Sequence, residues 1–366
     1  MFAEGRARTR AMTVWAVSGA AGLSLGALLG GLLTGAFGWQ AVFFVNVPPA
    51  AAVAAAAFVV LTPDGRRRAG GFDLPGALTG TAGVTLLVFT VAQAGERGWA
   101  SPAVLAPAVV AAALLAGFFV IERRGRTPLL PPRLPASRHT SAGAMVILVY
   151  GLTLQCVPCF LTLHFQDVLG YGAVESGLAF LGPTLAITAG NLAAERLIPR
   201  LGLRGTLVLS LGVGAAGTAA LASLLSPGAS YLGLLPGLAA YGLGAGLSFA
   251  TMFMVASTGV APQVQGVVSG LSSTVLQAGT AAGLAVLVSV AGGDTAGLAG
   301  QALRAATSEG LRSAVWVAAA ISVIGVAAAL ALPSAPARSA ARPDRTRDTP
   351  ARPAGGPGIR SRGRPR

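Results

Sequence analysis

The sequence has no lysine and very little charge of either sign. Charged residues make up 10% of its 366 residues, whereas a typical soluble domain carries about 25%. A chain with so few charges cannot cover a water-exposed surface, and its mean hydropathy is +0.71. We therefore expect most of its surface to face lipid.

Cysteine is also scarce. The two cysteines, Cys156 and Cys159, lie together inside an apolar run. A metal or redox site of this type would need a second CxxC pair or a flanking βαβ pattern, and the sequence has neither. Both cysteines are better explained as small buried side chains. We expect His164 at the membrane interface and His139 in a loop, so we predict no metal site and no cofactor.

The sequence contains 12 acidic residues, and none falls in the middle of an apolar run. Five lie at the ends of these runs, Asp73, Glu96, Asp167, Glu175 and Glu195, and the rest lie in loops or tails. Ionisable residues within a membrane usually mark proton pathways or other functional sites. An intramembrane enzyme would need clustered Asp, His or Ser–Lys groups at membrane depth, so we expect no catalytic residue and no enzyme activity.

Long apolar runs fill most of the chain. A transmembrane helix needs about 20 predominantly apolar residues. The windows that meet this condition number ten: 13–34, 41–61, 74–94, 103–121, 141–163, 176–194, 205–225, 231–254, 267–290 and 313–332. This pattern predicts an all-α fold, a polytopic transmembrane helix bundle of about ten spans in a lipid bilayer.

The arginines indicate how the bundle is oriented. When the segments between the windows are assigned alternately to the two sides, every arginine except Arg97, Arg304 and Arg312 falls on the same side. Cytoplasmic loops carry the excess of positive charge, so this side, with both termini, is predicted to be cytoplasmic. Because the arginines are spread over five segments, we predict no nucleic-acid partner. Residues 333–366, rich in arginine and proline, are expected to form a disordered cytoplasmic tail.

Small residues form a ridge along the first window. The stretch GLSLGALLGG (22–31) places Gly22, Gly26 and Gly30 four residues apart, with Gly31 beside them. Each glycine in a helix interior costs roughly 0.5–1 kcal/mol relative to alanine. In lipid, small residues allow two helix backbones to approach closely, so we interpret the ridge as a face for close helix packing.

The segment GLSLGALLGGLLTGAFGWQAVFFVNVPPA (22–50) resembles the fifth and sixth helices of the fourteen-helix drug:proton antiporters of the major facilitator superfamily. The antiporter motif of that family has the form GxxxGPxxGG, followed by a tryptophan turn and then NVP. The positions that match are Gly22, Gly26, Gly30, Gly31, Trp39, Asn46 and Pro48. Two positions depart from the pattern, because Ala27 replaces the proline and Gln40 replaces an arginine.

The resemblance continues along the chain to residue 332. GFDLPGALT (71–79) is similar to the beginning of the family's seventh helix, with Asp73 placed to cap it. ERLIPRLGLRG (195–205) resembles the second copy of the family's cytoplasmic loop motif and keeps Arg200, Gly202 and Arg204, although Pro199 replaces an acidic residue. A plain loop that is positive because it is cytoplasmic is the alternative explanation of these arginines.

The resemblance also implies a domain organisation. Counted against the family, the ten windows correspond to helices five to fourteen, so the first four helices are expected to be absent from this chain. Residues 1–61 would be a two-span remnant of the amino-terminal bundle, and residues 62–139 two linker spans with a cytoplasmic loop. Residues 140–332 would form the carboxy-terminal six-helix bundle.

The function implied by the resemblance is efflux of small amphipathic molecules across the plasma membrane by alternating access, coupled to protons. Few polar groups could line a substrate path: Asn46, Gln155, Asn191 and Gln277. Amides of this kind commonly form interhelical hydrogen bonds instead. The alternative is a non-transporting membrane fragment, or a half-transporter that needs a partner. Because no acid lies at mid-membrane, we expect this chain alone to lack proton-coupled transport.

Overall fold

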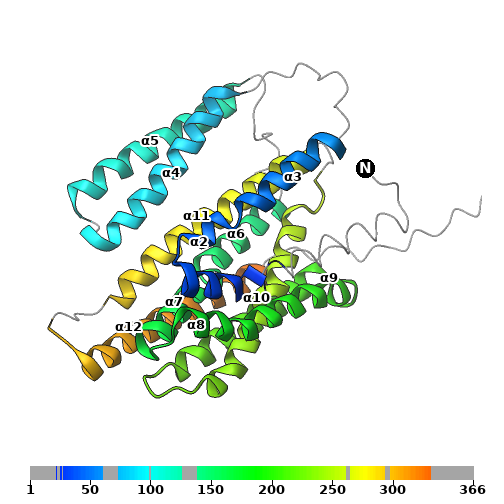
Figure 1. Ribbon diagram of the computed structural model, residues 1–366. Coiled ribbons are helices and arrows are strands. Elements are labelled where there is room, and N and C mark those ends of the chain that lie inside the picture. The colour runs from blue at the N-terminus through cyan, green and yellow to red at the C-terminus, as the bar shows by residue number, and fades with distance from the viewer. Residues whose placement is uncertain are drawn as a thin grey trace, which may run out of the picture. The chain divides into compact units, whose positions relative to one another are not determined.

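The computed structural model describes residues 22, 25, 26, 28–60, 73–98, 100–125, 138–260, 264–292 and 297–330. Every regular element among these residues is a helix (Figure 1). The first is the short apolar helix Leu28–Phe37. The labelled α-helices are α2 (Ala41–Phe44), α3 (Val47–Val60), α4 (Leu74–Arg97), α5 (Pro102–Arg124), α6 (Arg138–Leu152), α7 (Val157–Leu163), α8 (Ala173–Ala179), α9 (Leu181–Leu224), α10 (Tyr231–Ala256), α11 (Gln265–Ala291) and α12 (Gly300–Leu330), and η1 (His164–Val168) is a π-helix. The predicted tail lies outside the described residues.

The apolar windows correspond to helices. Eight helical stretches in the described part of the chain are long and apolar enough to cross a membrane. They correspond to nine of the ten expected windows, all except 13–34. Eight stretches match nine windows because Ala173–Leu224 contains two of them. Only part of 13–34 is described. The chain is therefore the polytopic helical membrane protein that its composition predicts.

Helix α9 is too long to be a single span. Its 44 residues would extend about 66 Å at 1.5 Å per residue, roughly twice the thickness of the hydrocarbon core. The chain turns at Gly202, whose φ of 71° and ψ of 169° lie in a region open almost only to glycine. Gly202 therefore separates the predicted spans 176–194 and 205–225, the first of which begins in α8.

Helix α4 begins at the predicted cap. The Oδ1 atom of Asp73 accepts a hydrogen bond from the backbone N–H of Gly76 at 2.9 Å. Pro75 lies in the first turn, where backbone N–H groups have no acceptor within the helix, so the N–H that proline lacks is not missed. The expectation that Asp73 caps this helix is confirmed.

The buried core lies among the helices from α6 to α12. Its largest fully buried side chains include Ile147, Phe160, Phe165, Leu211 and Leu238. By contrast, α2 and α3 have no buried residue, and Phe58 on α3 is 90% exposed. Apolar side chains this exposed are favourable against lipid and unfavourable against water.

Helices α4 and α5 lie side by side (Figure 1). A Cβ added to Gly83 would lie 2.9 Å from the Leu115 side chain, and one added to Gly80 would lie 3.1 Å from the Phe118 ring. Because larger residues at these two positions would push the helices apart, glycine sets their spacing. Helix α4 also contacts α11.

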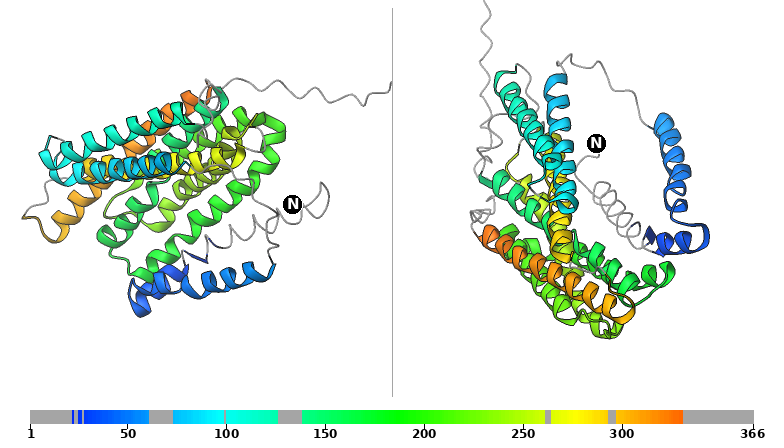
Figure 2. Two further views of the ribbon diagram at one scale, coloured as in Figure 1. Left: turned by 90° about the horizontal axis from the view of Figure 1, so that it is seen from above. Right: turned by 90° about the vertical axis from the view of Figure 1, so that its left-hand side faces the viewer.

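Helices α9 and α10 make the most extensive helix–helix contact of the core, and they lie side by side in both views of Figure 2. Their backbones approach at glycines of both helices. A Cβ added to Gly242 would lie 2.6 Å from the carbonyl oxygen of Pro183, and one added to Gly246 would overlap the carbonyl group of Ile187. In lipid no hydrophobic effect drives helices together, so their association depends on the close packing that small residues allow.

We predict that replacing Gly246 by alanine destabilises the chain by about 1–3 kcal/mol, because its methyl group would overlap backbone that cannot move aside. The matched control is Gly212→Ala in α9, where a Cβ would meet no described atom within 4 Å. This control should be neutral or stabilising, since alanine favours helix. Thermal unfolding of the purified chain in detergent measures both, and equal melting temperatures for the two variants would contradict the prediction.

Candidate functional site

The glycines of the antiporter-like stretch have different surroundings. A Cβ added to Gly31 would lie 2.7 Å from the carbonyl oxygen of Ala173 and 3.1 Å from the Cα of Gly177, both in α8. The other three would place a Cβ with no described atom within 4 Å: Gly22, Gly26 and Gly30. The first helix therefore approaches α8 through Gly31, and close packing by the other three glycines stays a prediction.

The residues of the cytoplasmic loop motif lie at the turn within α9. Arg200 is exposed and Arg204 is half-buried, one on each side of Gly202. The turn itself explains the glycine, because the positive φ of Gly202 excludes other residues. The two arginines give a short connection between two spans a positive charge, and their role as a loop motif stays a prediction.

The predicted span 141–163 is broken near its middle. Helix α6 ends, residues 153–156 form a turn, and α7 then begins with Pro158 in its first turn. Gln155 lies in this turn with its side chain exposed. Cys159 is exposed as well, so the prediction that both cysteines are buried is wrong for Cys159. Cys159 lies in the first turn of α7, directly after the break.

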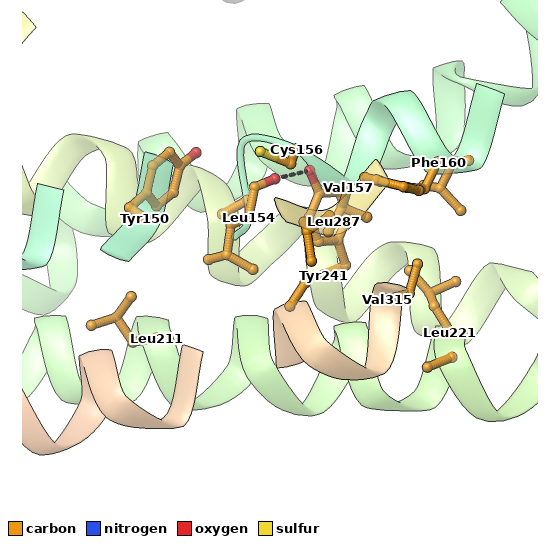
Figure 3. Packing of buried hydrophobic residues seen from close by; sticks show 14 of the residues in the cluster. Tyr150, Leu154, Cys156, Val157, Phe160, Leu211, Leu221, Tyr241, Leu287 and Val315 are labelled. Carbon is orange, nitrogen blue, oxygen red and sulfur yellow. Dashed lines mark hydrogen bonds between the residues drawn. The ribbon is translucent and has the colours of Figure 1, made fainter. Parts of the chain in front are cut away.

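A break inside a span leaves backbone groups that need partners other than water. The hydroxyl of Tyr241, on α10, donates a hydrogen bond to the carbonyl oxygen of Leu154 at 2.9 Å, in a buried position (Figure 3). The thiol of Cys156 donates to the carbonyl oxygen of Gly151 at 3.2 Å. The Tyr241 bond holds the unwound turn against α10, and the Cys156 bond joins it to the end of α6. Many transporters build their binding sites around broken helices of this kind.

The four amide side chains expected to line a substrate path are not joined to one another by any hydrogen bond recorded in the described residues. The Nδ2 atom of Asn46 donates to the carbonyl oxygen of Val42 at 2.7 Å, within its own segment. Gln155 and Gln277 are exposed and Asn191 is half-buried. Gln155 differs from the others because it lies in an unwound turn. A role of these residues in a substrate path stays a prediction.

His164 is a candidate that the sequence does not reveal. Its expected position at the membrane interface stays a prediction. The structure shows that it is fully buried within the protein at the start of the π-helix η1, which packs against α7, α8 and α12. Neither ring nitrogen has a hydrogen-bond partner among the described residues. Buried polar atoms are rarely left unpaired, and π-helical turns are frequent at functional sites. A single histidine in an apolar run gives little indication of this burial.

Comparison with known protein families gives one match over most of the chain. The sequence profile of the Major Facilitator Superfamily matches residues 1–284. This range includes the broken span, the turn at Gly202 and most of α11.

Named relatives are similar over about four fifths of the chain. It is 38% identical over 304 residues to the cephamycin export protein CmcT of Amycolatopsis lactamdurans, covering 81% of this chain and 62% of that protein. It is 35% identical over 301 residues to the puromycin resistance protein pur8 of Streptomyces alboniger, covering 81% and 59%. It is 31% identical over 302 residues to the multidrug resistance protein Stp of Mycobacterium tuberculosis, covering 79% and 53%. The chain thus spans about three fifths or less of the length of these relatives.

We predict that replacing Tyr241 by phenylalanine loosens the unwound turn. The buried carbonyl group of Leu154 would lose its partner, at a cost of about 1–3 kcal/mol. In a Cys159→Ser background, the remaining buried thiol, Cys156, should react several times faster with maleimide and the chain should melt at a lower temperature.

Tyr231→Phe is the matched control for this substitution. It removes a hydroxyl that also donates to a carbonyl oxygen, that of Ala179, at 3.0 Å. Because this bond lies away from the turn, Tyr231→Phe should leave the maleimide reaction of Cys156 at its original rate. If Tyr241→Phe also leaves it unchanged, the hydroxyl of Tyr241 does not hold the turn.

Proposed function

The chain belongs to the Major Facilitator Superfamily, and we propose that it acts in the efflux of amphipathic small molecules from the cell. The observation that carries this proposal is the similarity, over 81% of the chain, to a protein named for cephamycin export. Two further relatives are named for puromycin resistance and multidrug resistance. Export produces resistance because it lowers the concentration of the compound inside the cell. On this proposal the chain is a transporter and not an enzyme.

Substrate contact is proposed at the unwound turn of residues 153–156. Gln155 offers an exposed side-chain amide there, and no hydrogen bond to this amide is recorded in the described residues. The surrounding helix surfaces are apolar, which suits amphipathic compounds of varied shape. Further contacts are proposed for Asn46, Asn191 and Gln277. Alternating access would then move the carboxy-terminal helices against a bundle that includes residues 1–61.

The membrane is proposed to be the plasma membrane, with both termini in the cytoplasm. Arg200 and Arg204 support this orientation, because they flank the turn between the two spans of α9 and positive residues are retained on the cytoplasmic side. Each span crosses to the other side. The connection from η1 to α8 and the connection from α11 to α12 would therefore both face outward.

The lack of a mid-membrane acid leads to the expectation that this chain alone lacks proton-coupled transport. The burial of His164 within the protein offers an alternative to such an acid, and we propose His164 as the group that couples transport to protons. The imidazole is the side chain whose ordinary titration lies closest to physiological pH. His164 is buried within the protein, and both of its nitrogens would gain partners if the contacts of η1 opened to water. The charged groups on the elements around it are Asp167 on η1, Glu175 on α8, and Arg304, Glu309 and Arg312 on α12. Helix α7 carries no charged residue.

We predict that cells expressing this chain accumulate less ethidium, an amphipathic fluorescent cation, than cells without it. Gln155→Ala should weaken efflux about fivefold, the effect of losing one hydrogen bond of about 1 kcal/mol. Gln166→Ala, which removes an exposed amide of η1 outside the unwound turn, is the matched control and should retain efflux.

Two other outcomes of the ethidium experiment count against the proposal as stated. Equal ethidium accumulation with and without the chain in the membrane would contradict efflux by this chain. If a co-expressed four-helix segment then restores efflux, the alternative of a half-transporter that needs a partner is correct.

We predict that His164→Gln abolishes the dependence of efflux on a pH gradient in proteoliposomes, while exchange of labelled substrate without a gradient continues. The chain has two histidines, so His139→Gln is the matched control and should keep the dependence. With ¹³C-labelled histidine, the NMR signal missing from His164→Gln identifies the buried ring and reports its titration. An unchanged gradient dependence in His164→Gln would exclude this residue as the coupling group.

A further inference from the structure

A half-open cavity of about 450 Å³ lies at the surface between the π-helix η1 and the beginning of α12. Its lining residues are Asp167, Gly300, Leu303, Arg304 and Thr307. This volume is within the range of pockets that hold small organic molecules, about 300–1,000 Å³. The cavity is distinct from the unwound turn at residues 153–156, and the efflux proposal does not use it.

The cavity contains one acid and one base that do not neutralise each other. Asp167 and Arg304 both line it, yet within the described residues no ion pair joins them. The next arginine on α12, Arg312, is paired with Glu309 at 3.6 Å. Two opposite charges that face one cavity without contact leave a gap that a molecule with both charges can fill.

The elements on both sides hold these charges in place. Helix η1 packs directly against α12. The guanidinium of Arg304 lies over the turn that follows η1, since a Cβ at Gly170 would be 3.9 Å from its Nη2 atom. Thr307 is one helical turn after Arg304, so its hydroxyl lies on the same face of α12. The carboxylate and the guanidinium are therefore presented from two packed helices and not from a loop.

The cavity lies beyond the apolar part of the spans. Helix α12 has 31 residues and extends about 46 Å at 1.5 Å per residue, longer than a hydrocarbon core of about 30 Å. Arg304 is in its first turns, ahead of the apolar window 313–332, and Asp167 follows the apolar window 141–163. Charged recognition at this position avoids the cost of placing ions in hydrocarbon.

We propose that this cavity is a binding site for small zwitterionic molecules. The carboxylate of Asp167 accepts hydrogen bonds from the ammonium group of the ligand, and the guanidinium of Arg304 donates to its carboxylate. The hydroxyl of Thr307 gives a further hydrogen bond, and Leu303 contacts the apolar body. Asp167 and Arg304 are both exposed, so a ligand with only one charge leaves the opposite charge to water, makes one charge-assisted contact fewer and binds more weakly.

The test measures binding to the purified full chain in detergent, without transport. Three fluorescent probes share a dansyl group and a five-carbon chain or its close equivalent. Nε-dansyl-lysine carries both charges, dansylcadaverine has only the amine, and 6-(dansylamino)hexanoic acid has only the carboxylate. We expect fluorescence anisotropy to give a dissociation constant for dansyl-lysine at least tenfold lower than for either of the other two.

The variants assign each charge to its residue. Asp167→Asn and Arg304→Gln should each weaken dansyl-lysine binding at least tenfold. Dansylcadaverine should respond to Asp167→Asn alone, and the hexanoic acid probe to Arg304→Gln alone. Arg312→Gln is the matched control, because it removes an arginine of the same helix that does not line the cavity, and it should leave all three constants unchanged.

The exchanged double variant Asp167→Arg/Arg304→Asp covers the case in which a single variant fails to fold. It keeps both charges in the cavity and should recover dansyl-lysine binding with the ligand reversed. Three results would overturn the proposal: equal affinity of the original chain for the three probes, unchanged dansyl-lysine binding in a folded single variant, or no dansyl-lysine binding in the folded double variant. Because no step of this test depends on efflux, its failure is distinguishable from failure of the proposed transport function.

Discussion

The structure depends on one constraint: in a bilayer, every backbone N–H and C=O group must find a partner within the protein. Helices satisfy this condition locally, and each departure from the helix needs its own solution. At Gly202 the chain turns at an exposed position between two spans. At residues 153–156 the turn lies within a span, and Tyr241 supplies a buried hydrogen bond to Leu154. The turn at residues 153–156 is the more informative of the two, because a side chain of the neighbouring helix α10 stabilises it.

The same solvent also determines how the helices associate. In lipid the hydrophobic effect does not drive helices to pack, so their association depends on close approach of the backbones at small residues. A pattern of small residues does not by itself identify the partner. On α11, a Cβ at Gly279 would lie 2.9 Å from the carbonyl oxygen of Leu148, whereas Gly266 and Gly270 would meet no described atom within 4 Å. The four-residue spacing makes close packing possible, and the position of the neighbouring helix decides where it occurs.

These two facts explain how much the sequence predicts. The spans, the cap at Asp73 and the connection at Gly202 follow from local composition and backbone preferences, so they are predictable. The burial of His164 and the exposure of Cys159 depend on which side of a helix meets a neighbour. In a soluble helix the polar side would indicate this, but here lipid-facing and core-facing sides are both apolar. Pro158 is a local indication of the break. Because proline is common in membrane helices, its presence alone does not predict that the span is broken there.

The distribution of polar groups follows from the cost of charge in lipid. A neutral amide such as Gln155 can be accommodated within a span, but an ion there costs several kcal/mol. The pair Asp167 and Arg304 lies where the apolar windows have ended, so full charges are tolerated without neutralising each other. If both proposals hold, a compound would contact neutral and apolar groups within the membrane and charged groups only outside the hydrocarbon core. Discrimination by shape and apolarity would then occur at the unwound turn, and discrimination by charge at the cavity between η1 and α12.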